Sequence, residues 1–358
     1  MMFENRNYGI DILKAICMFY VVILHALGRW GLLDPAITGG QQYYAAWFLE
    51  TLAFCAVDCF ALITGYLSYR DGVSKLKLGN IILLWLEIVF YGALNILIKK
   101  IFGLSIQENE LRLSFCPILS NAYWYFTAYL GLYLFIPIIM NGLRIISDRH
   151  SKVILAGIIL IFTIMETCTG NFNTASGYSF VWLLILCIGG GIIKKIDLFP
   201  KVSSNAKIFI ILSCCILSYC LKMNSGILRS DIILSKVFIN TVEYISPFMF
   251  ITAVSYLLLF SKLAIKSEKL KRMAKGMGEG AFAVFVLNNP RFVYDSFLHS
   301  IFEVSPISSV LKIVISPTLC AIVFVLGTFV MDYARRRLFY YIGINRLLYR
   351  LDLLLNEQ

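Results

Sequence analysis

Long apolar stretches recur along the chain from one end to the other, and short polar stretches separate them. Most of the apolar stretches approach the roughly 20 residues that a helix needs to cross the hydrocarbon core of a bilayer. They predict ten membrane-spanning helices, at about residues 9–28, 44–67, 79–98, 121–141, 153–168, 178–193, 207–222, 235–260, 277–296 and 309–334. We therefore expect an all-α fold, a polytopic transmembrane helix bundle.

Basic residues gather in alternate connections between the predicted spans, at 70–77, 144–152, 194–207 and 262–275, and again after the last span, at 335–337. Cytoplasmic loops of membrane proteins carry an excess of lysine and arginine. An even number of spans puts both chain ends on one side, so both termini are expected in the cytoplasm. Residues 1–358 are expected to form a single membrane domain, with residues 335–358 as a basic cytoplasmic tail.

Composition agrees with a membrane protein and argues against a nucleic-acid-binding one. The chain is 59% hydrophobic and 15% charged, and its mean hydropathy is +0.79. A soluble domain cannot bury that much apolar surface, so lipid is expected to cover much of it. The net charge is +11, but the basic residues lie in short loops and form no stripe with interleaved aromatic residues. We expect a lipid bilayer, and no nucleic acid, as a partner.

Ten cysteines are scattered along the chain, mostly within apolar stretches. They form no CxxC pair, and no histidine stands at zinc-ligand spacing from them. We therefore expect free thiols packed among helices, and no bound metal.

The first predicted span contains three ionisable residues, Asp11, Lys14 and His25. A separation of eleven residues brings Lys14 and His25 to nearly the same face of a helix, roughly 16 Å apart along its axis. Asp11 lies three residues before Lys14 and can pair with it. Because charged groups are costly in lipid, this face is expected to point into the bundle or a water-filled cavity. The alternatives are that Lys14 reaches the membrane interface and that His25 bonds a loop carbonyl at the helix end.

Other polar or aromatic residues mark the later spans and the loops beside them. They are Asp58, Arg70, Glu87, Trp124, Tyr125, Glu243 and the break Asn288-Asn289-Pro290. A proline inside a span frees backbone groups that need partners in protein or water, so a cavity wall is expected at that break. Some of these residues can also have a purely structural role. Arg70 can anchor the cytoplasmic end of the second span, and Trp124 fits an aromatic belt at the membrane interface. Glu87 can form a structural hydrogen bond inside the bundle.

Four stretches, taken in order, carry a resemblance to a known family. They are the Lys14-x10-His25 pair of the first span, "VDCFALITGYL" (57–67), "WYFTAYLGLYLFIP" (124–137) and "AFAVFVLNNP" (281–290). Together they resemble the acyltransferase-3 family of bacterial integral-membrane acyltransferases, which modify cell-envelope glycans. The chain departs from the family pattern at its late histidine, which is Asn288 here, and at two tyrosines, which are Phe282 and Phe285. No fused hydrolase-like domain is recognisable, so the stand-alone form is expected.

The resemblance implies a bacterial multi-pass protein of the cytoplasmic membrane that transfers an acyl group, usually acetyl. The donor would be cytoplasmic acyl-CoA, with acetyl-CoA as the expected form, and the acceptor would be a sugar hydroxyl of a surface or capsular polysaccharide, a lipid-linked glycan or another envelope glycan. A sugar hydroxyl needs a general base, for which we expect His25. Lys14, Arg70 and Lys75 are expected to attract the phosphates of CoA, and Asp58 to orient or balance these basic groups. The residues expected to bind substrate are Trp124, Tyr125, Asn288 and Glu87.

Two other functions fit the same residues. The polar side chains also suit a transporter or flippase component for glycans, in which they would line a translocation path. The asparagine at position 288 also fits an inactive partner of a glycan-synthesis complex.

Overall fold

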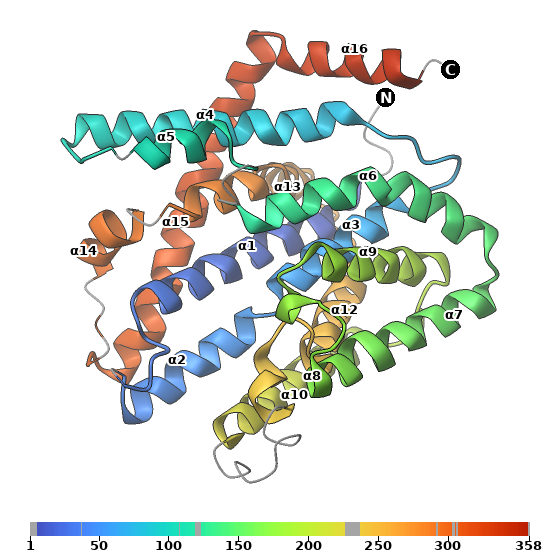
Figure 1. Ribbon diagram of the computed structural model, residues 1–358, viewed down its shortest axis with the longest axis horizontal. Helices are drawn as coiled ribbons and strands as arrows, with labels where there is room; N and C mark the ends of the chain where they lie inside the picture. The colour runs from blue at the N-terminus through green and yellow to red at the C-terminus, as the bar shows by residue number, and fades with distance from the viewer. Residues whose placement is uncertain are drawn as a thin grey trace.

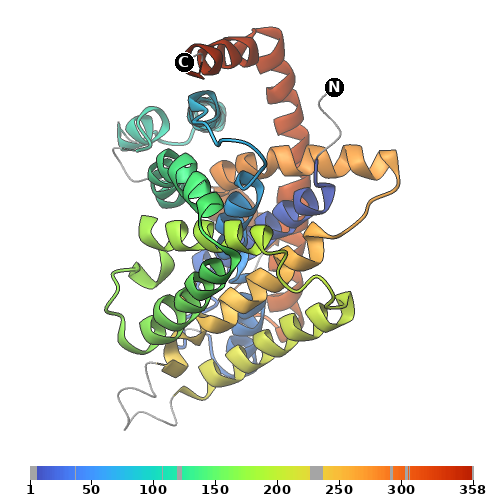
Figure 2. The same cartoon turned by 90° about the vertical axis from the view of Figure 1, so that its right-hand side faces the viewer.

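The computed structural model describes residues 6–36, 38–106, 108–118, 123–225, 237–290, 293–302, 305 and 307–356. Every regular element in these ranges is helical (Figures 1 and 2). In chain order the elements are α1 (Tyr8–Arg29), α2 (Gly40–Ala53), α3 (Ala56–Ser68), α4 (Leu78–Ile101), α5 (Glu108–Phe115), α6 (Trp124–Ile145), α7 (Asp148–Gly157), the π-helix η1 (Ile158–Met165), α8 (Glu166–Thr169), the 3₁₀ turn η2 (Ala175–Gly177), α9 (Phe180–Lys195), α10 (Ser204–Met223), the 3₁₀ turn η4 (Asn240–Val242), α12 (Pro247–Ser261), α13 (Glu268–Asn288), the π-helix η5 (Val293–Leu298), α14 (His299–Phe302), α15 (Val310–Tyr341) and α16 (Ile344–Asn356).

The fold class predicted from the apolar pattern is confirmed: the protein is an all-α, polytopic membrane bundle. Each predicted span is mostly helical, but the helix is interrupted at residues 54–55, 243–246 and 289–290, and one span begins two residues before its helix, at 178–179. Residues 121–122, 235–236 and 291–292 of the predicted spans lie outside the described residues. By length and composition, eight helical segments of the described chain can cross a membrane: Tyr8–Arg29, Gly40–Ser68, Leu78–Ile101, Trp124–Ile145, Asp148–Thr169, Ser204–Met223, Val237–Ser261 and Val310–Tyr341. Of the other two predicted spans, α9 has only 16 residues and α13 begins with a charged turn. Ten spans and cytoplasmic termini stay predictions.

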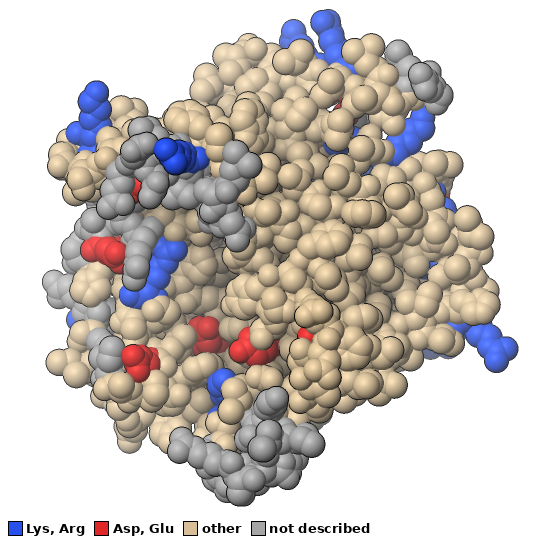
Figure 3. Space-filling model, in the orientation of Figure 1, with Lys and Arg blue, Asp and Glu red and all other residues tan. Residues whose placement is uncertain are grey.

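The outer surface of the bundle is largely apolar, as a bilayer requires. In the view of Figure 3 the right-hand part of the surface carries almost no charged side chains, whereas Asp and Glu with some Lys and Arg are visible at and left of the centre. The exposed side chains include large apolar ones on α6, α7 and α10, among them Ile138, Val153 and Phe209. All ten cysteines are free, as expected from their spacing.

Helix α1 occupies the centre of the bundle. It packs against α2, α3, α12, α13 and α15, and the apolar side chains of Leu13, Val22 and Leu27 are fully buried among them. The side chain of Asn7 begins the helix by accepting a hydrogen bond from the backbone N–H of Ile10 at 3.0 Å. A helix surrounded in this way has no face directed only at lipid, so its polar residues meet other helices or a cavity.

Helices α3 and α9 approach each other closely through glycines. A Cβ atom on Gly65 would lie 1.9 Å from the carbonyl oxygen of Cys187, and one on Gly190 would lie 2.1 Å from that of Leu62. Small residues permit such backbone contact between membrane helices. The same interface contains Asp58, whose Oδ1 accepts a hydrogen bond from Trp182 Nε1 at 2.9 Å.

The C-terminal segment differs from the tail predicted for residues 335–358. Helix α15 continues through residue 335 to Tyr341 because Arg335 is buried and forms ion pairs with Glu87 and Asp332. Helix α16 then lies across the end of the bundle beside α4 (Figure 1). Position 335 is therefore not an element boundary, and the residues after it fold against the rest of the molecule.

Candidate functional site

A cavity of about 770 Å³ runs along α1, α3, α4, α6 and α13. Its wall includes residues from both ends of α3, and it extends from Lys14 to His25 on α1. At one end it meets the α3–α4 connection (residues 69–77), and at the other it meets Tyr178 of the α8–α9 connection. The cavity therefore follows the length of the helices and joins opposite ends of the bundle.

Helix α1 presents one face to this cavity. Lys14, Met18, Val21 and His25 all line it, at the spacing of successive turns on one side of a helix. The expectation that Lys14 and His25 share a face directed into the bundle is confirmed. Lys14 Nζ lies 3.7 Å from Asp11 Oδ1, so the predicted pairing of these two residues is also present.

His25 contacts the break at the end of α13. Asn288 Nδ2 lies 3.0 Å from His25 Nδ1, and the Asn288 carbonyl oxygen lies 3.4 Å from the same nitrogen. The hydroxyl of Tyr294 donates to Asn288 Oδ1. Asn288 is fully buried and is absent from the wall of the cavity as far as the described chain defines it. In this structure the Asn288 amide contacts His25 and Tyr294, and substrate binding by Asn288 stays a prediction.

Arg29 contacts the same break in the chain as His25. Arg29, one turn after His25, donates to the carbonyl oxygen of Asn289 at 2.5 Å. Its guanidinium also lies 4.7 Å from the centre of the Tyr294 ring, within the range of a cation–π interaction. These contacts tie the end of α1 to the chain on both sides of Pro290.

The end of the cavity beside the α3–α4 connection is basic. Arg70, Lys75, Lys77 and Arg144 line it together with Lys14. Among them are the two loop residues predicted to hold CoA, Arg70 and Lys75. The Lys75 ammonium also donates to the carbonyl oxygen of Asn356 in α16, at 3.0 Å.

Glu87, which was expected either to bind substrate or to form a structural hydrogen bond, lines the cavity from α4. Its Oε1 forms an ion pair with Arg335 at 3.0 Å, and the carboxylate is only 4% exposed. Glu87 is thus paired with Arg335 and also forms part of the cavity wall.

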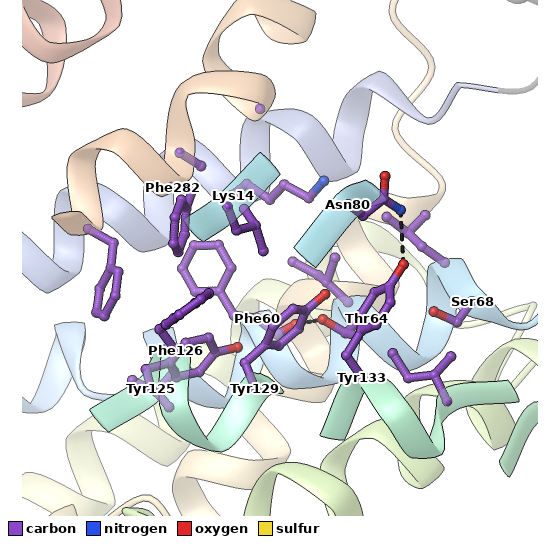
Figure 4. A pocket seen from close by; sticks show the side chains of 18 of the residues that line it. Lys14, Phe60, Thr64, Ser68, Asn80, Tyr125, Phe126, Tyr129, Tyr133 and Phe282 are labelled. Atoms are coloured by element: carbon purple, nitrogen blue, oxygen red, sulfur yellow. Dashed lines mark hydrogen bonds between the residues drawn. The ribbon is translucent and has the colours of Figure 1, made fainter. Parts of the chain in front are cut away.

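A row of tyrosines on α6 forms another wall. Tyr125, Tyr129 and Tyr133 follow at intervals of four residues, with neighbouring ring centroids 6.2 and 5.9 Å apart. Figure 4 shows the three rings along one side of the cavity, opposite Lys14. Asn80 donates to the Tyr133 hydroxyl at 2.9 Å. Only Tyr125 was predicted as a site residue. The four-residue spacing of Tyr125, Tyr129 and Tyr133 also indicates that all three share one helical face.

The opposite end of the cavity is aromatic and contains a carboxylate. Trp124 lies on the wall, as expected, with its ring centroid 4.9 Å from that of Tyr178. The ring centroid of Tyr244 lies 4.9 Å from that of Tyr178 and 4.5 Å from that of Phe54. Glu50 of α2 lines the same end. Glu50 was not predicted as a site residue, although an acid inside an apolar span is a usable signal.

Asp58 lies away from the basic groups that it was expected to orient. It is fully buried in the α3–α9 interface, where Trp182 donates to it, and the described residues of the cavity wall do not include it. The reason is its position on α3: the face that carries Asp58 packs against α9, whereas Thr64 and Phe60 face the cavity. The expectation for Asp58 is corrected to a helix-packing contact.

Residues 7–333 match the acyltransferase-3 family, which is described as an acyltransferase domain. The chain belongs to the acyltransferase-3 family. No curated protein and no solved structure matches it significantly. The family match covers the cavity walls on α1, α3, α4, α6 and α13, and so includes both Lys14 and His25. This acyltransferase is a multi-pass membrane protein in which Lys14 and His25 line one cavity.

Proposed function

We propose that this membrane acyltransferase transfers an acetyl group from cytoplasmic acetyl-CoA to a sugar hydroxyl of an envelope glycan, in a bacterial cytoplasmic membrane. The observation that carries the proposal is the single cavity, which connects a basic end, His25 and an aromatic end. An enzyme with a donor on one side of the membrane and an acceptor on the other needs such a passage.

The basic end of the cavity suits the phosphates of CoA. Arg70, Lys75 and Lys77 line this end, and Lys14 lies further along the wall. Arginine and lysine form strong charge-assisted hydrogen bonds with phosphate. CoA is a substrate that leaves after each turnover, so these residues would bind its phosphates while the thioester arm extends along the tyrosine row towards His25.

The reaction needs one proton to move. As the acceptor hydroxyl oxygen attacks the thioester carbonyl, His25 removes the hydroxyl proton. The new C–O ester bond forms and the C–S bond breaks, and the proton passes from His25 to the departing thiolate of CoA. The products are an acyl ester and free CoA, and no electrons are exchanged with another reagent.

Asn288 decides which nitrogen of His25 can act as the base. With Nδ2 beside Nδ1, the amide donates to His25, and the neutral ring then carries its proton on Nε2. Rotating the amide by half a turn brings Oδ1 beside Nδ1, so that Nδ1 carries the proton and Nε2 is free to accept one. Tyr294 remains satisfied, because its hydroxyl also lies 3.4 Å from the carbonyl oxygen of Val22. We propose that the rotated arrangement is the reactive one.

Two measurements test the proposed function. Membranes containing the protein are incubated with acetyl-CoA labelled in its acetyl group, and ester-linked acetyl is quantified on the envelope glycans of wild-type, deletion and His25→Ala strains. Replacing His25 is expected to lower transfer by about 10²–10⁴-fold, the usual contribution of a positioned base. His150→Ala is the matched control, because His150 is exposed on α7 and bonds Ser147, away from the cavity.

Undiminished transfer by His25→Ala would remove His25 from the mechanism. Failure of glycan export in the deletion strain, with acetylation unchanged, would instead identify the protein as a transporter component.

A further inference from the structure

Glu50 is a buried carboxylate whose function the reaction above does not explain. It lies on α2, one turn before Phe54, and only 7% of the residue is exposed. It lines the aromatic end of the cavity, and its Oε2 has no hydrogen-bond partner among the described residues. A buried carboxylate oxygen without a donor is costly, and more so within a membrane span. The arrangement is one that a ligand with hydrogen-bond donors would complete.

The surrounding side chains narrow the chemistry of that ligand. Trp124, Tyr178 and Tyr244 line the same end of the cavity and contact one another through their rings. Aromatic rings give broad, rigid contact surfaces at a small cost in conformational entropy, and tyrosine adds a hydroxyl. Ring faces beside a hydrogen-bond acceptor suit a molecule that has C–H faces and hydroxyl edges, which describes a sugar.

The two ends of the cavity differ in charge. Lys14, Arg70, Lys75 and Lys77 give the end beside the α3–α4 connection a basic character, although Asp71, Glu87 and Glu279 also line the wall. Lys222 of α10 interacts electrostatically with Glu50 but lies outside the wall as described, 4.8 Å from the Trp47 ring. With no lysine or arginine in the described wall at the aromatic end, a phosphate or carboxylate would lose its water there and gain no cationic partner in the wall. The aromatic end therefore disfavours phosphate and carboxylate groups.

We propose that Glu50, Trp124, Tyr178 and Tyr244 form the acceptor subsite, in which Glu50 accepts a hydrogen bond from a hydroxyl of an uncharged sugar. This inference rests on the proposed function and adds the acceptor class and the residue that orients it. Glu50 is a binding and positioning residue: it holds the sugar so that a neighbouring hydroxyl faces His25. The lysines and arginines at the other end of the described wall favour the phosphates of CoA there.

The native acceptor is present in cells, so the test uses strains that carry wild-type protein, Glu50→Ala, Glu50→Gln, Asp34→Asn or a deletion. Ester-linked acetyl on envelope glycans is quantified, and the sugar that bears it is identified by mass spectrometry. We expect Glu50→Ala to lose at least about tenfold, and Glu50→Gln to lose less, because its amide oxygen still accepts a hydrogen bond. Asp34→Asn, an exposed acid that caps its loop through Oδ1, is the control and is expected to match wild type.

A second measurement separates binding of the acceptor from damage to the fold. The purified variants are titrated with CoA, and the increase in thermal unfolding temperature is recorded. Glu50→Ala is expected to keep the wild-type increase, because Glu50 lies at the end away from the basic residues. Loss of that increase would make Glu50 a structural residue and overturn the inference.

Three other outcomes are decisive. Wild-type ester content in Glu50→Ala would exclude Glu50 from acceptor binding while leaving the proposed function intact. An ester found on a uronic acid or a phosphorylated sugar would overturn the acceptor class. A wild-type strain with no more ester than the deletion strain would overturn the proposed function itself, and the acceptor subsite with it.

Discussion

At the scale of single residues, Asn288 shows how one substitution can preserve a site. In the aligned stretch 281–290 described above, Asn288 takes the place of a histidine in the family pattern. Its Nδ2 lies 3.0 Å from His25 Nδ1. An amide can donate through nitrogen or accept through oxygen, so it can serve either neutral form of the imidazole. The departure from the family pattern therefore leaves His25 with a hydrogen-bond partner, and it does not by itself argue for an inactive protein.

Variants of Asn288 test this orientation. Asn288→Asp presents only acceptor oxygens to Nδ1 and is expected to retain acetyl transfer, because it favours the form of His25 with a free Nε2. Asn288→Leu removes the partner and is expected to lower transfer by about 10–100-fold, the usual cost of losing a group that orients an imidazole. Labelled acetyl transfer at saturating acetyl-CoA measures both.

A contrary result is equally informative. If Asn288→Asp were as impaired as Asn288→Leu while both proteins bound CoA normally, the rotated amide would not be the reactive arrangement.

At the scale of elements, the contact between α3 and α9 holds one wall of the cavity in place. Gly65 and Gly190 let the two backbones touch, and the Asp58–Trp182 hydrogen bond crosses the same interface. Thr64 and Phe60 on the other side of α3 line the cavity. Any change that separates the helices should therefore disturb both stability and the cavity wall.

Gly65→Ala tests the close approach. Its Cβ would lie 1.9 Å from the Cys187 carbonyl oxygen, so the helices must separate, and overpacking of this kind costs about 1–3 kcal/mol. We expect a lower thermal unfolding temperature in detergent. Gly327→Ala in α15 is the control: nothing lies within 4 Å of its Cβ position, and it is expected to be neutral or slightly stabilising. Equal unfolding temperatures for both variants would show that the backbone contact does not limit stability.

At the scale of the whole molecule, a network of buried and half-buried charges joins four helices. Its members are Arg6 and Asp11 at the start of α1, Lys14 of α1, Glu87 of α4, Glu279 of α13, and Asp332, Arg335 and Arg336 of α15. Tyr91 of α4 also donates to Asp332, at 2.9 Å. The network reaches the cavity at both Glu87 and Lys14. It therefore couples the packing of the bundle to the wall that would receive the donor.

Arg335→Leu tests the contribution of this network to stability. Arg335 forms ion pairs with Glu87 at 3.0 Å and Asp332 at 2.6 Å, and all three side chains are buried. Removing one partner of a buried ionic cluster leaves uncompensated charge and typically costs about 3–5 kcal/mol. Arg337→Leu is the matched control, because Arg337 is exposed and, among the residues that the structure describes, bonds Tyr333 of its own helix. Comparable thermal unfolding of the two variants would show that the buried pairs add no net stability.

The sequence by itself determined the helical class and the polar face of α1. Apolar length predicts spanning helices because the bilayer sets the length, and Lys14 and His25 share a face because one helix carries both. It also singled out Trp124, Tyr125 and Glu87 as candidates for substrate binding, and all three line the cavity.

Only the tertiary structure decided which helices meet. The aromatic end draws Glu50, Trp124, Tyr178 and Tyr244 from four segments that are far apart in sequence, and no periodicity relates them. For the same reason Asp58 was expected at the site but faces α9, and the contact between Asn288 and His25 was not predicted. Local pattern fixes the faces of each helix, whereas the partner of each face depends on how all the helices pack together.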